Sequence, residues 1–463
     1  MKELERSLSD ADVLSLRDSF TGALTLPGDD GYEQARAVWN AVPDRYPAIV
    51  VRPVDENDVI TALRFAREQD LVVAVRSGGH SVAGFSTCDG GMVIDLRSMN
   101  RVEIDPDGKV ARVQSGAMLS QLDAAAQAHG LACPVGVVGH TGIGGLTLGG
   151  GMGRLMRRHG LTVDNVRSLN VVTADGRVVR ASEDENADLF WGMRGAGANF
   201  GIVTEFELQL HEVGPQVVAG MVAHPIERAH EIAGLYRDLV ASAPDEVFPA
   251  FYFTVALPEE EFPPEIAGRP MVAIALTHFG PVDEAERYVA AVRGDGAIID
   301  TFQQRSFLDV QAVNDEPMAW GHRFYMKGAL LPDLKPGFID AAVEAVARVP
   351  GAGEISLWAM GGAISRVPED AMAFTGREAT YWVGVETLWD DPARDGEVIG
   401  WARSTMASLK PFTTAGHYVN DMVETGTDVV RSVYGDAKYE RLVALKRAWD
   451  PDNVFRLNQN VQP

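Results

Sequence analysis

The chain has 463 residues, more than one hydrophobic core usually supports, and its 46% apolar and 23% charged residues are typical of a folded globular protein. Its formal net charge of −24 repels nucleic acid and anionic lipid headgroups, which argues against a function on DNA, RNA or a membrane surface. No window offers the roughly 18 uninterrupted apolar residues of a membrane-spanning helix, and the charged start of the chain has no apolar signal segment, so we expect a soluble cytoplasmic protein.

The N-terminal part of the chain predicts short strands separated by a helix and a tight turn. Apolar residues at helical spacing follow Asp55, and the apolar run 71–75 is typical of a buried strand. A second strand is expected at 92–96. The runs 102–104 and 110–113 flank an Asp-Pro-Asp-Gly turn and predict a hairpin.

The next part of the chain contains an unusual concentration of glycine. An amphipathic helix is expected at 119–129, stopped by a glycine. It is followed by the segment 140–153, in which seven of fourteen residues are Gly and which we interpret as a loop. A hairpin, a short helix and a strand are then expected at 169–181, 188–194 and 202–210.

Near residue 212 the glycine-rich turns become sparse, and strand-like runs alternate with helical ones. The expected strands include 217–222, 251–256, 272–277 and 381–386, and the expected helices include 284–292, 338–346, 396–409 and 439–449. This pattern predicts an α+β chain with a second domain after the glycine-rich one.

Two glycine-rich segments suggest a binding site for a dinucleotide. Arg76-Ser77-Gly78-Gly79-His80-Ser81 follows a buried strand, and such turns expose backbone N–H groups that bind a pyrophosphate when glycine allows close approach. The segment 140–153 offers the same chemistry again. Neither has the Gly-x-x-x-x-Gly-Lys-Ser/Thr pattern of a P-loop, and neither fits the Rossmann fingerprint. Taken alone, each segment is weak evidence for a binding site, because glycine-rich segments are more often simply tight turns.

The two cysteines, Cys88 and Cys133, provide no disulfide framework and no zinc-type cluster. The histidines show no metal-ligand spacing. We therefore expect no metal.

The motifs taken together are more specific than any one of them. They are Arg76-Ser77-Gly78-Gly79-His80-Ser81, the segments 90–96, 140–153, 160–165 and 188–201, Tyr418-Val419-Asn420 and the segment 450–460. In this combination the chain resembles the FAD-linked oxidases with the vanillyl-alcohol-oxidase (PCMH-type) fold, in particular their berberine-bridge-enzyme-like branch. The resemblance runs essentially from end to end.

The resemblance implies a fold and its boundaries. It implies a PCMH-type FAD-binding domain of two subdomains at 1–211, an inserted substrate domain of antiparallel sheet covered by helices at 212–411, and a C-terminal segment at 412–463 that returns to the FAD-binding domain.

The resemblance also implies how FAD is held. His80 matches the histidine that bonds to the flavin 8α-methyl group, and Ser77, Gly78, Gly79 and Ser81 would cradle the pyrophosphate. The residues expected along the flavin and ribityl chain are Gly142, Gly144, Gly145, Gly150 and Gly153, and those near the adenosine are Gly197, Gly201 and Val203. Further cofactor contacts are expected from Arg76, His140, Asn458 and Asn460.

Cys133 leaves an alternative open. Some members bind flavin a second time through a cysteine in a Cys-Pro pair that precedes Gly-Gly-His. Here Cys133-Pro134 is present, but Gly139 has no glycine neighbour and the spacing to His140 is one residue short. A free cysteine is more often a small buried apolar residue. A second bond and a single bond therefore both remain possible.

On the substrate side the resemblance is less complete. Tyr418 matches a tyrosine that acts at or near the catalytic base, although the family commonly has a second aromatic residue where this chain has Asp421. Tyr252 matches a flavin-adjacent tyrosine, and Thr141 and Leu146 match positions that contact oxygen in polyketide-tailoring members. A carboxylate expected before Gly361-Gly362 is replaced by Ser356, with Glu354 two residues earlier.

The sequence thus predicts an enzyme in which a small organic substrate (an alcohol, sugar, amine or polyketide-like molecule) loses a hydride to flavin N5 and O2 reoxidises the flavin. Alternatives are a dehydrogenase with another electron acceptor, an enzyme that oxygenates flavin N5, and a flavin-carrying protein without turnover. The substrate and the oligomeric state are not indicated.

Overall fold

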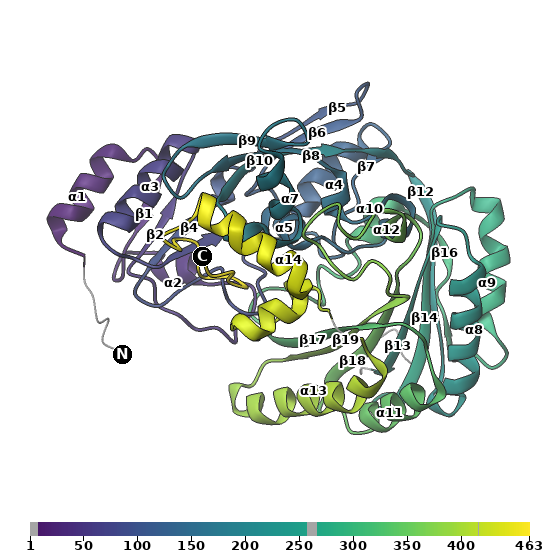
Figure 1. Ribbon diagram of the computed structural model, residues 1–463. Coiled ribbons are helices and arrows are strands. Elements are labelled where there is room, and N and C mark those ends of the chain that lie inside the picture. The colour runs from purple at the N-terminus through teal and green to yellow at the C-terminus, as the bar shows by residue number, and fades with distance from the viewer. Residues whose placement is uncertain (1–7, 257–265, 415) are drawn as a thin grey trace.

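The structure, a computed structural model, describes residues 8–256, 266–414 and 416–463. Two smaller sheets and the C-terminal helix α14 (Thr427–Trp449) form one half of the molecule, and a large sheet with its own helices forms the other (Figure 1). The chain returns to its beginning after α14, because Phe455 packs in the same core as the N-terminal strands and Arg67 forms an ion pair with Asp452 at 2.9 Å.

The first sheet carries the predicted attachment histidine at its edge. Its strands, in order, are β1 (Ala23–Thr25), β2 (Ile49–Arg52), β4 (Met92–Asp95) and β3 (Val73–Arg76). The strands β2, β4 and β3 are parallel, and the predicted helix after Asp55, α3 (Glu56–Glu68), covers them and is capped by the Asp55 carboxylate. The motif 77–81 leaves the end of β3.

The second sheet is antiparallel. Its strands, in order, are β5 (Val102–Asp105), β6 (Val110–Gln114), β10 (Ile202–Gln209), β8 (Val166–Val172) and β9 (Val178–Ser182). The two predicted hairpins and the predicted strand at 202–210 are confirmed. Its apolar face shares one core with α4 (Leu119–Gln127), α7 (Ala187–Ala196) and α14.

The third sheet has eight strands, and all of its pairings are antiparallel. The order is β15 (Ile299–Asp300), β12 (Gln216–Pro225), β14 (Pro270–His278), β13 (Val247–Val255), β18 (Ala352–Ala359), β19 (Tyr381–Trp389) and β17 (Arg323–Leu331), and β16 (Gln303–Ser306) also pairs with β12. The helices α8 (Ala229–Ser242), α9 (Ala285–Arg293), α11 (Pro336–Val346) and α13 (Asp395–Leu409) cover one face (Figure 1). The other face is turned toward the smaller sheets.

The remaining elements are short. They are α1 (Asp10–Ser19), α2 (Tyr32–Arg36), α5 (Ile143–Gly149), α6 (Met156–His159), α10 (Phe307–Gln311) and α12 (Ala363–Arg366), with the strand pair β7 (Leu131–Ala132) and β11 (His211–Glu212). Among the described residues, no helix is long and apolar enough to cross a lipid bilayer.

The interpretation of 140–153 as a loop is wrong for half of that segment, because 143–149 is the helix α5. Glycine costs about 1 kcal/mol in a helix relative to alanine, so the helix exists through its packing. A β-carbon on Gly144 would lie 3.2 Å from the Ser77 side chain, and one on Gly149 would lie 2.1 Å from the Asn420 side chain. Tertiary contact thus outweighs local preference here.

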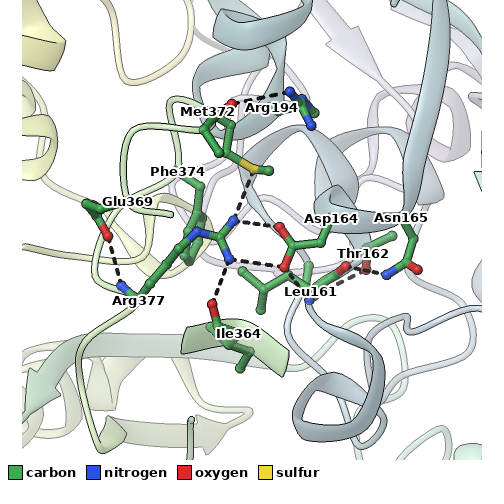
Figure 2. Close-up of polar contacts among 12 residues, drawn as sticks. Leu161, Thr162, Asp164, Asn165, Arg194, Ile364, Glu369, Met372, Phe374 and Arg377 are labelled. Atoms are coloured by element: carbon green, nitrogen blue, oxygen red, sulfur yellow. Dashed lines mark hydrogen bonds and ion pairs between the residues drawn. The ribbon is translucent and has the colours of Figure 1, made fainter. Parts of the chain in front are cut away.

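A buried ion pair joins the two halves beside their interface. Arg377, from the segment between β18 and β19, donates to both carboxylate oxygens of Asp164, at 2.5 and 3.1 Å, as Figure 2 shows. Both side chains are almost fully buried. The same Asp164 carboxylate accepts from the backbone N–H of Leu161 at 2.9 Å, so the motif 160–165 is fixed against the large sheet's loops.

Candidate functional site

One cavity of about 1110 Å³ lies between the two halves and is lined by both. It brings together most of the predicted site residues: Ser77, Gly78, Gly79, His80, Ser81, Thr141, Gly142, Gly144, Gly145, Leu146, Gly197, Gly201, Val203, Tyr252, Tyr418 and Asn458. Pockets for drug-sized ligands occupy about 300–1,000 Å³. The cavity therefore has room for a dinucleotide and a small substrate.

His80 occupies a well-defined position in this cavity. Its ring stacks on Trp39 with centroids 4.6 Å apart and planes 12° apart. His80 Nε2 lies 2.8 Å from His140 Nδ1, and His80 Nδ1 lies 3.4 Å from Thr141 Oγ1. Burial, assisted by the neighbouring His140, lowers the pKa of His80 to about 3, so this imidazole is neutral at physiological pH and keeps an unprotonated ring nitrogen.

The two glycine-rich segments contact each other directly. A β-carbon on Gly78 would lie 2.1 Å from the backbone nitrogen of Gly142, and one on Gly142 would lie 2.0 Å from that of Gly78. Ser77 Oγ joins the same segments, because it donates to the Ser115 carbonyl at 2.5 Å and accepts from Gly144 N–H at 3.2 Å. Glycine is required at 78 and 142 for this backbone contact, a reason that the sequence did not reveal.

Gly145 differs from these glycines. It lines the cavity, and a β-carbon built on it meets no atom within 4 Å. The wall at Gly145 is bare main chain facing open space, which is what a closely approaching planar ring system requires.

Several predicted cofactor residues do not line the cavity. Arg76 is fully buried and donates to the carbonyls of Ala35, Arg36 and Ser86, so it supports the motif from beneath. The others are His140, which contacts His80, and Gly150, Gly153, Asn460 and Cys133.

Cys133 is fully buried in the core beneath the second sheet. Its thiol contacts the Pro134 carbonyl at 3.8 Å, and burial raises its pKa, which keeps the sulfur in its unreactive protonated form. The position and the protonation both favour the interpretation of Cys133 as a packing residue.

The C-terminal tail supplies polar atoms that need partners. Asn458 and Gln459 line the cavity, and among the described residues Asn458 Oδ1 and Gln459 Oε1 are buried without a hydrogen-bond donor. A buried acceptor without a donor costs about 1–3 kcal/mol. FAD carries amino and hydroxyl donors on its adenosine, so this region fits that group.

The opposite wall is the face of the eight-stranded sheet that is turned toward the smaller sheets. Directly paired residues of antiparallel strands share a face, and Tyr252 pairs with Ser356, which pairs with Gly384. Two residues along, Glu354 pairs with Glu386 on the same face. The sheet therefore presents Tyr252 and two adjacent carboxyl groups to the cavity.

Asp421 completes a group of three carboxyl side chains. Its Oδ2 accepts from Trp382 Nε1 at 2.7 Å, whereas Oδ1 is buried without a partner among the described residues. It packs against Gly328, where a β-carbon would overlap the carboxylate. Burial raises its pKa to about 8, and burial likewise raises the pKa values of Glu354 and Glu386, which also repel each other.

Glu386 was not predicted as a site residue, and Asp421 stands out in the sequence only as a departure from the family pattern. The one available signal was the position of Asp421 beside Tyr418. The pairing of Glu386 with Glu354 depends on strand register, which a sequence pattern does not specify.

Tyr418 connects the two walls. Its hydroxyl oxygen accepts from the backbone N–H groups of Gly151 and Met152, at 2.9 and 3.3 Å, and from Asn420 Nδ2 at 2.8 Å. Burial nevertheless raises its pKa to about 12, with these three hydrogen bonds opposing the shift. At neutral pH the group is therefore a phenol.

Two family models match separate parts of the chain. Residues 47–182 match the family model described as "FAD binding domain", and residues 417–462 match the one described as "Berberine and berberine like". The first contains both glycine-rich segments, and the second contains Tyr418 and the C-terminal tail.

Similar proteins cover nearly the whole chain. The (R)-6-hydroxynicotine oxidase of Paenarthrobacter nicotinovorans is 34% identical, over 96% of this chain and 97% of its own. An FAD-linked oxidoreductase, pgmH, of Aspergillus terreus is 31% identical, over 97% of this chain and 95% of its own.

Solved structures show the same arrangement of both halves. The crystal structure of 6-hydroxy-D-nicotine oxidase from Arthrobacter nicotinovorans has a TM-score of 0.86 at 31% identity, covering 96% of this chain and 98% of its own. A berberine-bridge-enzyme-like protein of Physcomitrella patens, at 23% identity and a TM-score of 0.86, covers 96% and 97%. The predicted α+β class with a large antiparallel sheet is confirmed.

Proposed function

Because the chain belongs to the berberine-bridge-enzyme-like family of FAD-linked oxidoreductases, we propose that it is an oxidase that holds FAD covalently through His80 and oxidises a small organic substrate with O2 as electron acceptor. One observation carries this proposal. A single cavity has a neutral imidazole at the bare main-chain wall and, on the facing side, hydrogen-bonding side chains and titratable carboxyl groups.

Residues of the first wall would hold the cofactor. Ser77, Gly78, Gly79 and Ser81 offer backbone N–H groups to the pyrophosphate, Gly142 to Gly145 border the ring system, and Asn458 receives donors from the adenosine. Bound FAD supplies the acceptor for a hydride from the substrate and passes the electrons to oxygen. The protein contributes the orientation of the donor carbon and the exclusion of water.

The facing wall would manage the substrate proton. A phenol with a pKa near 12 donates a hydrogen bond at neutral pH, so Tyr418 orients the substrate oxygen or nitrogen. A raised pKa means that the ionised form of a carboxyl group binds a proton more tightly, so the ionised fraction of these groups would accept the substrate proton. We assign the role of proton acceptor to the three neighbouring carboxyl side chains of Glu354, Glu386 and Asp421, which Tyr252 borders.

Thr141 and Leu146 line the cavity on the cofactor side. We propose that they border the path of oxygen, as the matching positions suggest. No feature of the cavity favours a dehydrogenase or a flavin-oxygenating enzyme over an oxidase. Reoxidation of the reduced flavin by air separates the oxidase from these alternatives.

The test is anaerobic reduction of the purified yellow protein with a panel of matched alcohols, aldoses and secondary amines, followed by admission of air. We expect one class to bleach the flavin absorbance, and air to restore it with formation of hydrogen peroxide. Bleaching that air does not reverse within the turnover time would indicate a dehydrogenase. Normal photoreduction without bleaching by any compound would contradict the enzymatic proposal.

A further inference from the structure

His140 lies directly behind the proposed attachment residue and has no role in the function described so far. Its Nδ1 is 2.8 Å from His80 Nε2, and its Nε2 is 3.2 Å from the backbone carbonyl of Asp315. His80 lines the cavity, whereas His140 lies outside the lining. The two imidazoles therefore form a chain that leads away from the cavity.

The end of this chain fixes the hydrogen positions along it. A carbonyl oxygen only accepts hydrogen bonds, so His140 Nε2 carries a hydrogen, and the Nδ1 of neutral His140 is an acceptor. His80 Nε2 must then carry the hydrogen of the contact between the rings. Neutral His80 is left with a free electron pair on Nδ1, the nitrogen beside Thr141 Oγ1.

Both rings are held firmly in this orientation. Trp39 stacks on His80 and donates from Nε1 to the Met318 carbonyl at 2.6 Å. The Asp315 carboxylate accepts from the backbone N–H of Gly139 at 2.5 Å, next to His140. The segment between α10 and β17, which belongs to the half with the large sheet, thus supports the attachment site from outside.

We propose that His140 is a positioning residue for the covalent attachment of FAD: it directs the bond to His80 Nδ1 and accepts the proton that His80 Nε2 loses. The inference rests on the proposed covalent link through His80. It concerns the maturation of the enzyme and not its turnover.

A C–H bond of the flavin 8α-methyl group breaks and its proton leaves to water, while a bond forms between that carbon and His80 Nδ1. The proton on His80 Nε2 passes to His140 Nδ1. The electron pair of the broken C–H bond reduces the flavin by two electrons, and O2 takes them up as hydrogen peroxide.

The experiment follows attachment with time. Unloaded chain, produced under riboflavin limitation, is mixed with FAD, and the covalently linked fraction is read from fluorescence in denaturing gels. We compare the natural chain with His140→Ala, with His140→Asn, which retains an acceptor but is a poor base, and with His129→Ala, an exposed histidine, as control. Non-covalent FAD binding is measured separately by fluorescence quenching.

General-base catalysis typically contributes about 10²–10⁴-fold. We expect His140→Ala to bind FAD normally but to link it at least about 100-fold more slowly, with recovery in millimolar imidazole, and His140→Asn to be intermediate. The fluorescence pH titration of the isolated flavin peptide from the natural chain should report attachment through Nδ1.

Three outcomes would overturn the inference. They are linkage by His140→Ala at the natural rate, slow linkage that imidazole does not accelerate, and attachment through Nε2. A natural chain that never links FAD would instead contradict the proposed attachment at His80 itself, so the two failures are distinguishable.

Discussion

The two walls of the cavity are built in different ways. The cofactor wall consists largely of main chain and small side chains, and Ser77 joins its two glycine-rich segments through hydrogen bonds to Ser115 and Gly144. The wall of the large sheet presents carboxyl groups, and Asp421 Oδ1 has no partner among the described residues. The first wall selects its ligand by shape and the second by charge and proton affinity. Substitutions that add atoms should therefore damage the first, and substitutions that change charge should alter the second.

The largest expected effect concerns the ion pair that holds the walls together. Arg377→Ala leaves the buried Asp164 carboxylate without its partner, which typically costs about 3–5 kcal/mol of unfolding free energy. Urea unfolding of the FAD-loaded protein measures this loss of unfolding free energy. The control is Arg366→Ala, which removes an exposed pair with Asp245 and should cost no more than about 1 kcal/mol. Equal losses of unfolding free energy in both variants would show that the ion pair between Arg377 and Asp164 does not stabilise the contact between the two halves.

Next in size is an effect on the cofactor wall alone. In a His80→Ala background, where binding is reversible, Gly145→Ala should weaken FAD binding about tenfold to hundredfold, because a methyl group intrudes where the ring lies. The unloaded chain should not lose stability, since alanine favours the helix by up to about 1 kcal/mol. Gly234→Ala, in α8 and equally free of contacts, is the control. An unchanged FAD affinity would contradict the placement of the ring.

The carboxyl groups of the substrate wall should make the stability of the protein depend on pH. The pKa of Asp421 is raised from its ordinary 3.8 to about 8, so the folded chain binds this proton more tightly than the unfolded chain. The resulting stability is fully present below about pH 4 and is lost as the pH rises through 8. Asp421→Asn should therefore match the natural chain at or below about pH 4 and exceed its stability by at least about 1 kcal/mol at pH 8. A stability difference between Asp421→Asn and the natural chain that is the same at both pH values, measured by thermal unfolding, would contradict the raised pKa of Asp421.

The smallest effect is expected at Cys133. Because its thiol is buried outside the cavity lining, Cys133→Ala should change the linked flavin content by less than about twofold. Absorbance after acid precipitation measures that content. Release of flavin from the variant, or a shift of its flavin spectrum on denaturation, would instead support a second bond between Cys133 and the flavin.

The sequence predicted those parts of the molecule that depend on local pattern. The helix capped by Asp55, both hairpins of the second sheet and the alternation of strands and helices after residue 212 are confirmed, because apolar periodicity and turn residues determine them. The glycine-rich helix α5 escaped prediction, since its stability comes from contacts with Ser77 and Asn420.

The same limit applies to the site. His80 stands in a recognisable motif, and the family resemblance identified it. The support of His140 by Asp315 and the pairing of Glu354 with Glu386 join segments distant along the chain or depend on strand register. No periodicity in a single sequence encodes such contacts, so only the folded structure reveals them.

The central claim is that FAD is joined to His80, and the most direct measurement is the mass of the tryptic peptide 77–97, which contains this histidine. We predict that in the purified yellow protein this peptide carries the increment of one FAD and that fragmentation assigns it to residue 80. An unmodified peptide, with all of the flavin recovered in the supernatant after acid precipitation, would contradict the account.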